Sequence, residues 1–161
     1  MDIPHTASRL GEALIEKGWM LACAESCTGG GIAAAVTDIP GSSQWFDRGF
    51  VTYTNLAKQE MLGVGADTLD NHGAVSEATV QEMVTGALSR SQARVAVAVS
   101  GIAGPGGGTD EKPVGTVCLA WQVVGGDSIV RTEHFSGDRS AIREQTVLCA
   151  LQGILNVVEH R

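Results

Sequence analysis

The feature that most constrains the fold is an uninterrupted run of small apolar residues, Val-Ala-Val-Ala-Val, at positions 95–99. Such a run is typical of a strand that helices cover on both faces of a sheet. The chain has 161 residues, of which 43% are hydrophobic and 18% charged, so it has the length and apolar content of one folded domain. We therefore expect residues 1–161 to form a single domain of the α/β class.

Segments with strand and helix patterns alternate along the chain. Strands are predicted at residues 20–24, 49–54, 94–100, 114–124 and 128–135. Helices are predicted at residues 6–17, in the apolar stretch that ends at 36, after an N-cap at Asn55, at 76–90, and after an N-cap at Asp138. Helical crossovers make the first three strands parallel, and the turn at 124–127 makes the last two a hairpin. The pattern predicts a three-layer α/β/α sandwich with a mixed, mostly parallel five-stranded sheet whose fourth strand is antiparallel.

Glycine concentrates in the loops that follow the predicted strands. The chain contains 21 glycines, and groups of them lie at residues 29–31, 101–108 and 125–126. The topology places the segments 26–31, 55–58, 101–113 and 137–143 at one edge of the sheet, which is where open α/β sheets bind ligands. We expect the functional site at this edge.

The loop at 26–31 joins a strand to the start of a helix. Its backbone N–H groups, at Cys27, Thr28, Gly29 and Gly30, and the positive end of the helix dipole favour an anion such as a phosphate or an oxyanion. No lysine follows the glycines, so the pattern lacks the phosphate-binding cation of nucleoside triphosphatases. The alternative interpretation is a tight turn without a ligand.

Ser26 in this loop is a candidate nucleophile, and a serine hydroxyl needs a base that accepts its proton. The four histidines lie near the termini, in a loop or in a predicted strand, so they assemble no Ser-His-Asp triad. Lys58 starts the helix after a neighbouring strand, and it could be the base if burial or a nearby Arg139 or Arg143 lowers its pKa. The alternative is a solvated lysine on a helix surface.

The glycine-rich loop after residue 99 could also contribute to the site. The candidate binding residues in it are Ser100, Gly101, Gly104 and Gly106. Their exposed N–H groups could bind a developing oxyanion or a ligand phosphate, although a flexible connector between strands would need no ligand.

Tyr53 and Arg139 are the remaining candidates. The Tyr53 hydroxyl could orient a base or a ligand, and the alternative is an ordinary strand residue. Arg139 lies in the first turn of the last helix, where a cation is unfavourable for the helix dipole, and this placement indicates an anionic ligand unless a local carboxylate pairs with it.

Charge and cysteine content exclude several classes of protein. A formal net charge of −7 argues against nucleic-acid binding, which needs clustered Lys and Arg. No apolar run reaches the roughly 18 residues of a membrane span, and residues 1–10 lack the apolar stretch of a signal peptide. The four cysteines lack a metal-ligand spacing, and free buried thiols are usual in the cytosol. We expect a cytoplasmic protein that binds a small molecule, not nucleic acid or a membrane.

Short motifs along nearly the whole chain resemble those of one known family, in that family's order. They are Ala-Glu-Ser-Cys-Thr-Gly-Gly at 24–30, Val-Thr-Tyr at 51–53 with Asn55 and Lys58, Gly-Ala-Val-Ser at 73–76, Ser-Gly-Ile-Ala-Gly-Pro at 100–105, Lys-Pro-Val-Gly-Thr at 112–116, and Gly-Asp-Arg at 137–139. With these motifs the chain is similar to the CinA C-terminal family, the nicotinamide-nucleotide amidases of the PncC type. Position 100 is a serine here, where the family often has threonine.

The resemblance implies a mixed five-stranded α/β/α sandwich and a reaction. The reaction is hydrolysis of nicotinamide mononucleotide to nicotinate mononucleotide and ammonia in pyridine nucleotide salvage, with no metal and no cofactor. Ser26 matches the family's nucleophile and Lys58 its base, and the mechanism we expect assigns the 5'-phosphate to Arg139 and the glycine loops.

Two other interpretations stay open. The chain could be a catalytically silent nucleotide-binding module, or Cys27 could act as a thiol nucleophile with only Glu25 and backbone next to it in sequence. A homodimer is expected because dimers are the commonest oligomers.

Overall fold

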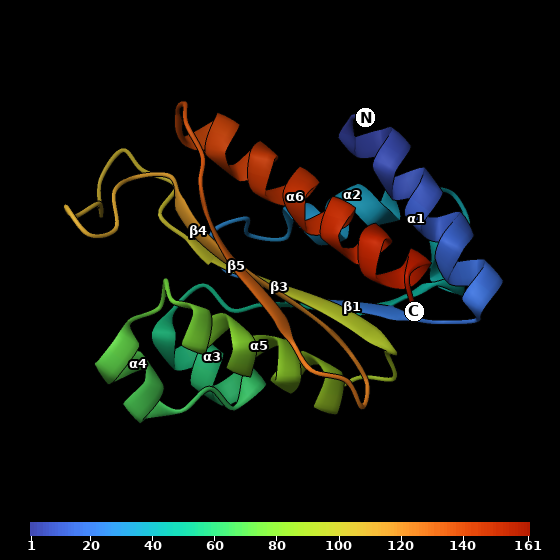
Figure 1. Cartoon of the computed structure of the whole chain (residues 1–161), viewed down its shortest axis with the longest axis horizontal. Helices are drawn as coiled ribbons and strands as arrows, with labels where there is room; N and C mark the ends of the chain where they lie inside the picture. The colour runs from blue at the N-terminus through green and yellow to red at the C-terminus, as the bar shows by residue number, and fades with distance from the viewer.

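A five-stranded sheet forms the middle layer of the structure, a computed structural model that describes residues 1–161 (Figure 1). Its strands are β1 (Leu21–Glu25), β2 (Phe46–Val51), β3 (Val95–Gly101), β4 (Thr116–Val123) and β5 (Ile129–His134). They lie in the order β2-β1-β3-β4-β5, with β1 parallel to β2 and β3, and β4 antiparallel to β3 and β5. The prediction of a mixed sheet with an antiparallel fourth strand is confirmed.

Helices cover both faces of this sheet (Figure 1). One face carries α1 (Ile3–Lys17), α2 (Gly31–Thr37) and α6 (Arg139–Glu159), and the other carries α3 (Asn55–Leu62), α4 (Ala66–His72) and α5 (Glu77–Ser89). The structure is therefore the predicted three-layer α/β/α sandwich. None of its helices combines the length and the apolar character that a membrane crossing requires.

The apolar run in β3 divides between the two layers of helices. Val95, Val97 and Val99 belong to a core cluster with α1, α2 and α6, whereas Ala96 and Ala98 belong to a second cluster with α5. All five side chains are fully buried. Because successive side chains in a strand point to opposite faces, this run supplies both hydrophobic cores at once.

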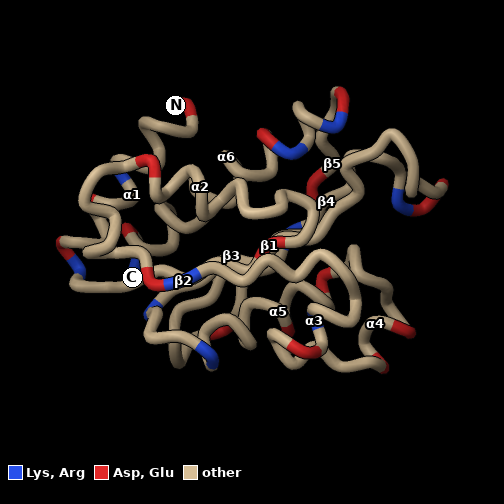
Figure 2. The backbone as a smooth tube through the Cα atoms, turned by 180° about the vertical axis from the view of Figure 1, so that it is seen from behind, with Lys and Arg blue, Asp and Glu red and all other residues tan.

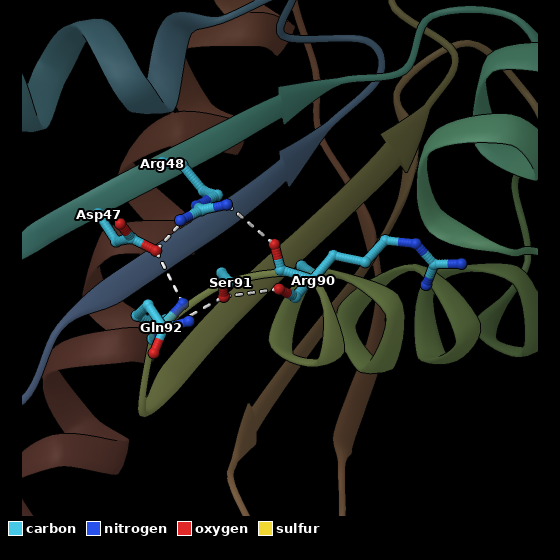
Figure 3. A network of polar contacts seen from close by, with 7 residues as sticks. Asp47, Arg48, Arg90, Ser91 and Gln92 are labelled. Carbon is cyan, nitrogen blue, oxygen red and sulfur yellow. Dashed lines mark hydrogen bonds and ion pairs between the residues drawn. The ribbon is translucent and has the colours of Figure 1, made fainter.

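Charged residues lie mainly on the helices and loops around the core (Figure 2). The central strand β3 carries none. At the start of the parallel strands, Asp47 accepts hydrogen bonds from Gln92 N and from Arg48 Nε, each at 2.9 Å, and Arg48 donates to Arg90 O at 3.2 Å (Figure 3). This network joins the edge strand β2 to the α5–β3 loop at the end of the sheet opposite to the carboxyl ends of these strands.

Two of the predicted helix caps are confirmed and one is wrong. Asp138 and Ser76 accept hydrogen bonds from the third residue of their helices, and so satisfy N–H groups that the first turn leaves unpaired. The N-cap of α3 is Thr54, whose side chain accepts from Ala57 N, and not Asn55. The first helix begins at Ile3, before the predicted residue 6, because Asp2 caps it.

The second strand lies three residues earlier than predicted, at 46–51 and not 49–54. It pairs with β1 from Leu21 to Glu25, and Val51 is opposite Glu25, the last residue of β1. Thr52 N–H still donates to Glu25 O at 2.8 Å, and the pairing of β2 ends there, where β1 ends. The helix α4 and a short 3-10 turn at Ser42–Gln44 were not predicted, because neither shows an apolar period over enough residues.

Candidate active site

A cavity of about 280 Å³ opens at the carboxyl ends of β1 and β3. The four segments predicted to converge at this edge all contribute to its lining, and Tyr53, Ala74, Val75 and Ser100 complete it. The lining residues are Ser26, Cys27, Tyr53, Asn55, Lys58, Ala74, Val75, Ser100, Gly101, Ile102, Ala103, Gly104, Gly106, Gly107 and Arg139.

Ser26 and Lys58 meet inside this cavity. Ser26 directly follows β1, and its N–H donates to Val99 O at 3.2 Å, which continues the sheet pairing past the strand end. The Nζ atom of Lys58 lies 2.9 Å from Ser26 Oγ. Both residues are buried, with 7% exposure for Ser26 and 1% for Lys58. The prediction that these residues share one sheet edge is confirmed, and the alternative of a solvated Lys58 is wrong.

The packing of α3 explains why a lysine lies inside. Lys58 and Leu62 are one helical turn apart and are the two buried residues of this helix. Thr54 starts the helix, so Lys58 falls on its inward face. The Lys58 Nζ also donates to Thr52 O at 3.0 Å and to Tyr53 O at 3.3 Å, two carbonyls that the chain exposes where it leaves β2.

Burial lowers the pKa of Lys58 below its ordinary value, and Cys27 opposes this shift more weakly. The sequence also suggested a nearby Arg139 or Arg143 as the cause, and this suggestion is wrong. Arg139 donates to Gly104 O and to Tyr53 Oη, and Arg143 donates to the carbonyls of the Ser26 loop. The pKa of Lys58 is thus lowered by the loss of solvent around its amine.

Cys27 is a poor nucleophile in this setting. Burial raises the pKa of its thiol to about 11, and the nearby charge of Glu25 adds to this rise. A thiol attacks as its thiolate, and at neutral pH very little of Cys27 is in that form. The structure therefore favours the Ser26 hydroxyl over the Cys27 thiol.

The cavity wall contains basic but no acidic side chains. Its basic residues are Lys58 and Arg139, and no Asp or Glu lines it. Arg139 donates to Gly104 O at 2.7 Å and to Tyr53 Oη at 3.0 Å, so it connects the glycine-rich loop to the Tyr53 ring at the mouth. This lining suits an anionic ligand. No three His, Cys, Asp or Glu side chains gather anywhere in the chain to hold a metal ion.

Residues 4–158 match the family model described as the CinA C-terminal domain. The chain belongs to the CinA C-terminal domain family. A protein of Enterobacter agglomerans named nicotinamide-nucleotide amidohydrolase PncC is 57% identical over 146 residues, which are 91% of this chain and 89% of that protein. The protein of the same name from Escherichia coli K12 is 53% identical over 151 residues, or 94% of this chain and 92% of that protein.

Solved structures of the CinA family share the fold. The crystal structure described as competence/damage inducible protein CihA from Agrobacterium tumefaciens superposes with a TM-score of 0.94 at 51% identity. The similarity covers 97% of this chain and 96% of that one.

The structure of this CinA domain brings most, but not all, of the predicted site residues into the cavity. Those that line it are Ser26, Cys27, Tyr53, Lys58, Ser100, Gly101, Gly104, Gly106 and Arg139. Three others, Thr28, Gly29 and Gly30, lie outside its lining. The Thr28 hydroxyl donates to Glu25 at 2.6 Å and so points away from the site. These three residues shape the loop that presents Ser26.

Sequence reasoning missed the role of Glu25 in the same CinA motif. This carboxylate is fully buried and accepts hydrogen bonds from Ile32 N at 2.8 Å and Ala33 N at 3.0 Å, in the first turn of α2. A negative charge at a helix N-terminus is stabilised by the helix dipole and by the unpaired N–H groups there. The signal in the sequence was an acidic residue between a buried strand and a glycine loop that opens a helix.

Proposed function

We propose that this protein hydrolyses the carboxamide of nicotinamide mononucleotide to give nicotinate mononucleotide and ammonia, and that it serves pyridine nucleotide salvage. The observation that carries the proposal is the buried contact of 2.9 Å between Lys58 Nζ and Ser26 Oγ. The names of the relatives at 57% and 53% identity supply the substrate class. A cytoplasmic setting is part of the proposal, because all four cysteines are free thiols.

Lys58 acts as the general base in this mechanism. A neutral lysine amine has two N–H donors and one lone pair, and the carbonyls of Thr52 and Tyr53 take the two donors. The lone pair is then left for the Ser26 hydroxyl proton. Burial favours the neutral amine, because removing solvent destabilises the ammonium form. The geometry places Lys58 Nζ within reach of the serine proton, and the lowered pKa favours its transfer.

The covalent step follows from this proton transfer. Ser26 Oγ gives its proton to Lys58 and forms a bond to the carboxamide carbon, while the carbonyl electron pair moves to the oxygen. When the oxyanion collapses, the C–N bond breaks, and the amide nitrogen takes the proton from Lys58 and leaves as ammonia. Water, deprotonated by Lys58, then attacks the acyl-Ser26 ester and releases the nicotinate product.

The 5'-phosphate binds at the mouth, where Arg139 and the N–H groups of the 101–107 loop can reach it. A guanidinium is suited to phosphate because it offers several donors in a plane. Binding energy from this remote group positions the carboxamide at Ser26, so the nucleotide is a better substrate than its riboside.

Ammonia release from nicotinamide mononucleotide tests the proposal. The wild-type protein should release ammonia, and Ser26→Ala should lower kcat by at least about 10³-fold without a change in melting temperature. A wild-type protein that binds the nucleotide but releases no ammonia would instead be a silent binding module. An undiminished rate in Ser26→Ala would remove this serine from the mechanism.

A further inference from the structure

The side-chain hydrogen bonds of Arg143 all go to the backbone of the loop that presents Ser26. We call residues 26–31 the nucleophile loop. From the first turns of α6, Arg143 Nε donates to Cys27 O and Arg143 Nη2 donates to Thr28 O, both at 3.0 Å. Arg143 forms no ion pair with a carboxylate, and it does not line the cavity. Because both hydrogen bonds of this guanidinium go to carbonyls of one loop, we infer that Arg143 sets the orientation of these peptide groups.

The two contacts fix the peptide planes of the nucleophile loop. In a trans peptide the C=O and the following N–H point in opposite directions, so a fixed carbonyl also fixes an N–H. Arg143 holds the carbonyl of Thr28, and the N–H of the same peptide group, that of Gly29, donates to Ser26 O at 3.1 Å. This hydrogen bond also fixes the Ser26–Cys27 peptide group, so the N–H of Cys27 points away from Gly29.

Among the loop N–H groups that donate to no other residue, only that of Cys27 belongs to a residue that lines the cavity. Ser26 N–H donates to Val99 O and Gly29 N–H donates to Ser26 O, whereas the N–H groups of Cys27, Thr28 and Gly30 donate to no other residue. Cys27 lines the cavity, and Thr28 and Gly30 do not. The N–H of the residue after a serine nucleophile lies close to the oxygen of the carbonyl that the serine attacks, so it can stabilise the oxyanion.

We propose that Arg143 is a positioning residue that holds the nucleophile loop so that the Cys27 N–H forms the oxyanion hole. The inference rests on the proposed amide hydrolysis at Ser26. Arg143 does not touch the substrate, and it acts through the two carbonyls. Glu25 holds the other side of the loop, since its carboxylate binds Thr28 Oγ1 and the N–H groups of Ile32 and Ala33. Arg143 thus binds two carbonyls of the loop, and Glu25 binds the Thr28 hydroxyl and the N–H groups that follow the loop.

Arg143→Ala tests this role when it is combined with added guanidinium. An oxyanion contact acts in the transition state, so kcat for ammonia release should fall about 10²-fold while KM for the nucleotide changes less than about 2-fold. Millimolar guanidinium chloride should restore part of kcat by occupying the vacated position. Arg143→Lys should remain impaired, because one ammonium cannot bridge both carbonyls as the planar guanidinium does.

Arg90→Ala is the matched control. Arg90 also donates to a backbone carbonyl, Leu62 O at 3.1 Å, but it lies on the far side of the sheet from α6 and outside the cavity. The Arg90→Ala variant should keep the wild-type kcat and should not respond to added guanidinium. Melting temperatures of both variants separate a loss of fold from a loss of positioning.

A second measurement does not depend on the substrate. A fluorophosphonate forms a bond from Ser26 Oγ to phosphorus, fluoride leaves, and Lys58 accepts the serine proton, while the phosphoryl oxygen occupies the oxyanion hole. The labelling rate, followed by intact mass, should fall in Arg143→Ala and stay unchanged in Arg90→Ala.

The outcomes separate the two proposals. If the wild type is labelled at Ser26 but releases no ammonia, the nucleotide assignment fails, and the labelling rates alone decide on Arg143. If Arg143→Ala matches the wild type in labelling, the positioning role is wrong. The role is also wrong if KM rises in step with the loss of kcat and guanidinium restores nothing.

Discussion

At the scale of single residues, the site depends on a lysine that the protein keeps out of water. A free lysine is protonated at neutral pH and cannot accept a proton. Lys58 differs because it is 1% exposed and has no carboxylate in the cavity wall to stabilise its charge. A serine without a histidine can therefore still have a base.

The pH dependence of kcat/KM should follow the ionisation of Lys58. Only the neutral amine accepts the serine proton, so activity should rise with pH and reach half its maximum below the ordinary lysine pKa, because burial lowers the pKa of Lys58. Rates of ammonia release between about pH 6 and 10 would show this limb. Lys58→Arg should be inactive throughout, since arginine stays charged. A profile that is flat across this range would contradict the role of Lys58 as base.

Replacing Arg139 should affect the nucleotide more than the riboside. Arg139→Gln removes a charged donor from the cavity mouth, and KM for nicotinamide mononucleotide should rise about 10- to 100-fold. The same change should have little effect on the already poor kcat/KM for nicotinamide riboside. Tyr53→Phe is the control, because it removes the hydroxyl that Arg139 contacts at 3.0 Å and keeps the guanidinium. An equal loss with both substrates would place the phosphate elsewhere.

At the scale of elements, the short helix α2 depends on a side chain from β1. Gly30, at its N-cap position, has no side chain to accept a hydrogen bond, and the Glu25 carboxylate binds the N–H groups in the first turn instead. The strand thus caps the helix across the nucleophile loop, and this contact fixes the distance between strand and helix around Ser26.

Glu25→Gln should destabilise the fold. The amide keeps one acceptor oxygen, places N–H donors next to backbone donors, and removes a charge that the helix N-terminus stabilises. We expect the free energy of unfolding in urea to fall by about 1–3 kcal/mol. Glu12 is exposed on α1, and Glu12→Gln should change this free energy by less than about 0.5 kcal/mol. An equal effect of both substitutions would contradict the capping role.

At the scale of the whole molecule, α6 and the sheet meet at a glycine. Trp121 on β4 is 2% exposed, and its Nε1 donates to Ala150 O of α6 at 3.0 Å. A Cβ added at Gly153 would overlap the Trp121 indole. The close approach of α6 also matters for function, because this helix carries Arg139 and Arg143 to the site.

Gly153→Ala should therefore destabilise the protein, although helix propensity alone would predict that it stabilises α6. Alanine is favoured over glycine by about 1 kcal/mol inside a helix, but overpacking a core costs about 1–3 kcal/mol. Thermal unfolding should show a lower melting temperature. Gln152→Ala, at the exposed neighbouring position, is the control and should leave it nearly unchanged. A higher melting temperature for Gly153→Ala would mean that the helix and the sheet do not pack this closely.

The sequence by itself determined the layers, the sheet topology and the edge at which the site lies. These follow from local patterns: the apolar run of β3, the caps at Ser76 and Asp138, and the loops that leave parallel strands on one side. The pairing of Ser26 with Lys58 was also accessible, because both residues follow neighbouring strands.

Only the tertiary structure decided the interactions that cross between elements. The end of β2 depends on where β1 ends, and the pKa of Lys58 depends on burial by segments distant in sequence. The contacts of Arg143 with Cys27 and Thr28 span more than a hundred residues. Periodicity and capping patterns report on neighbours along the chain, whereas these interactions exist only once the layers pack.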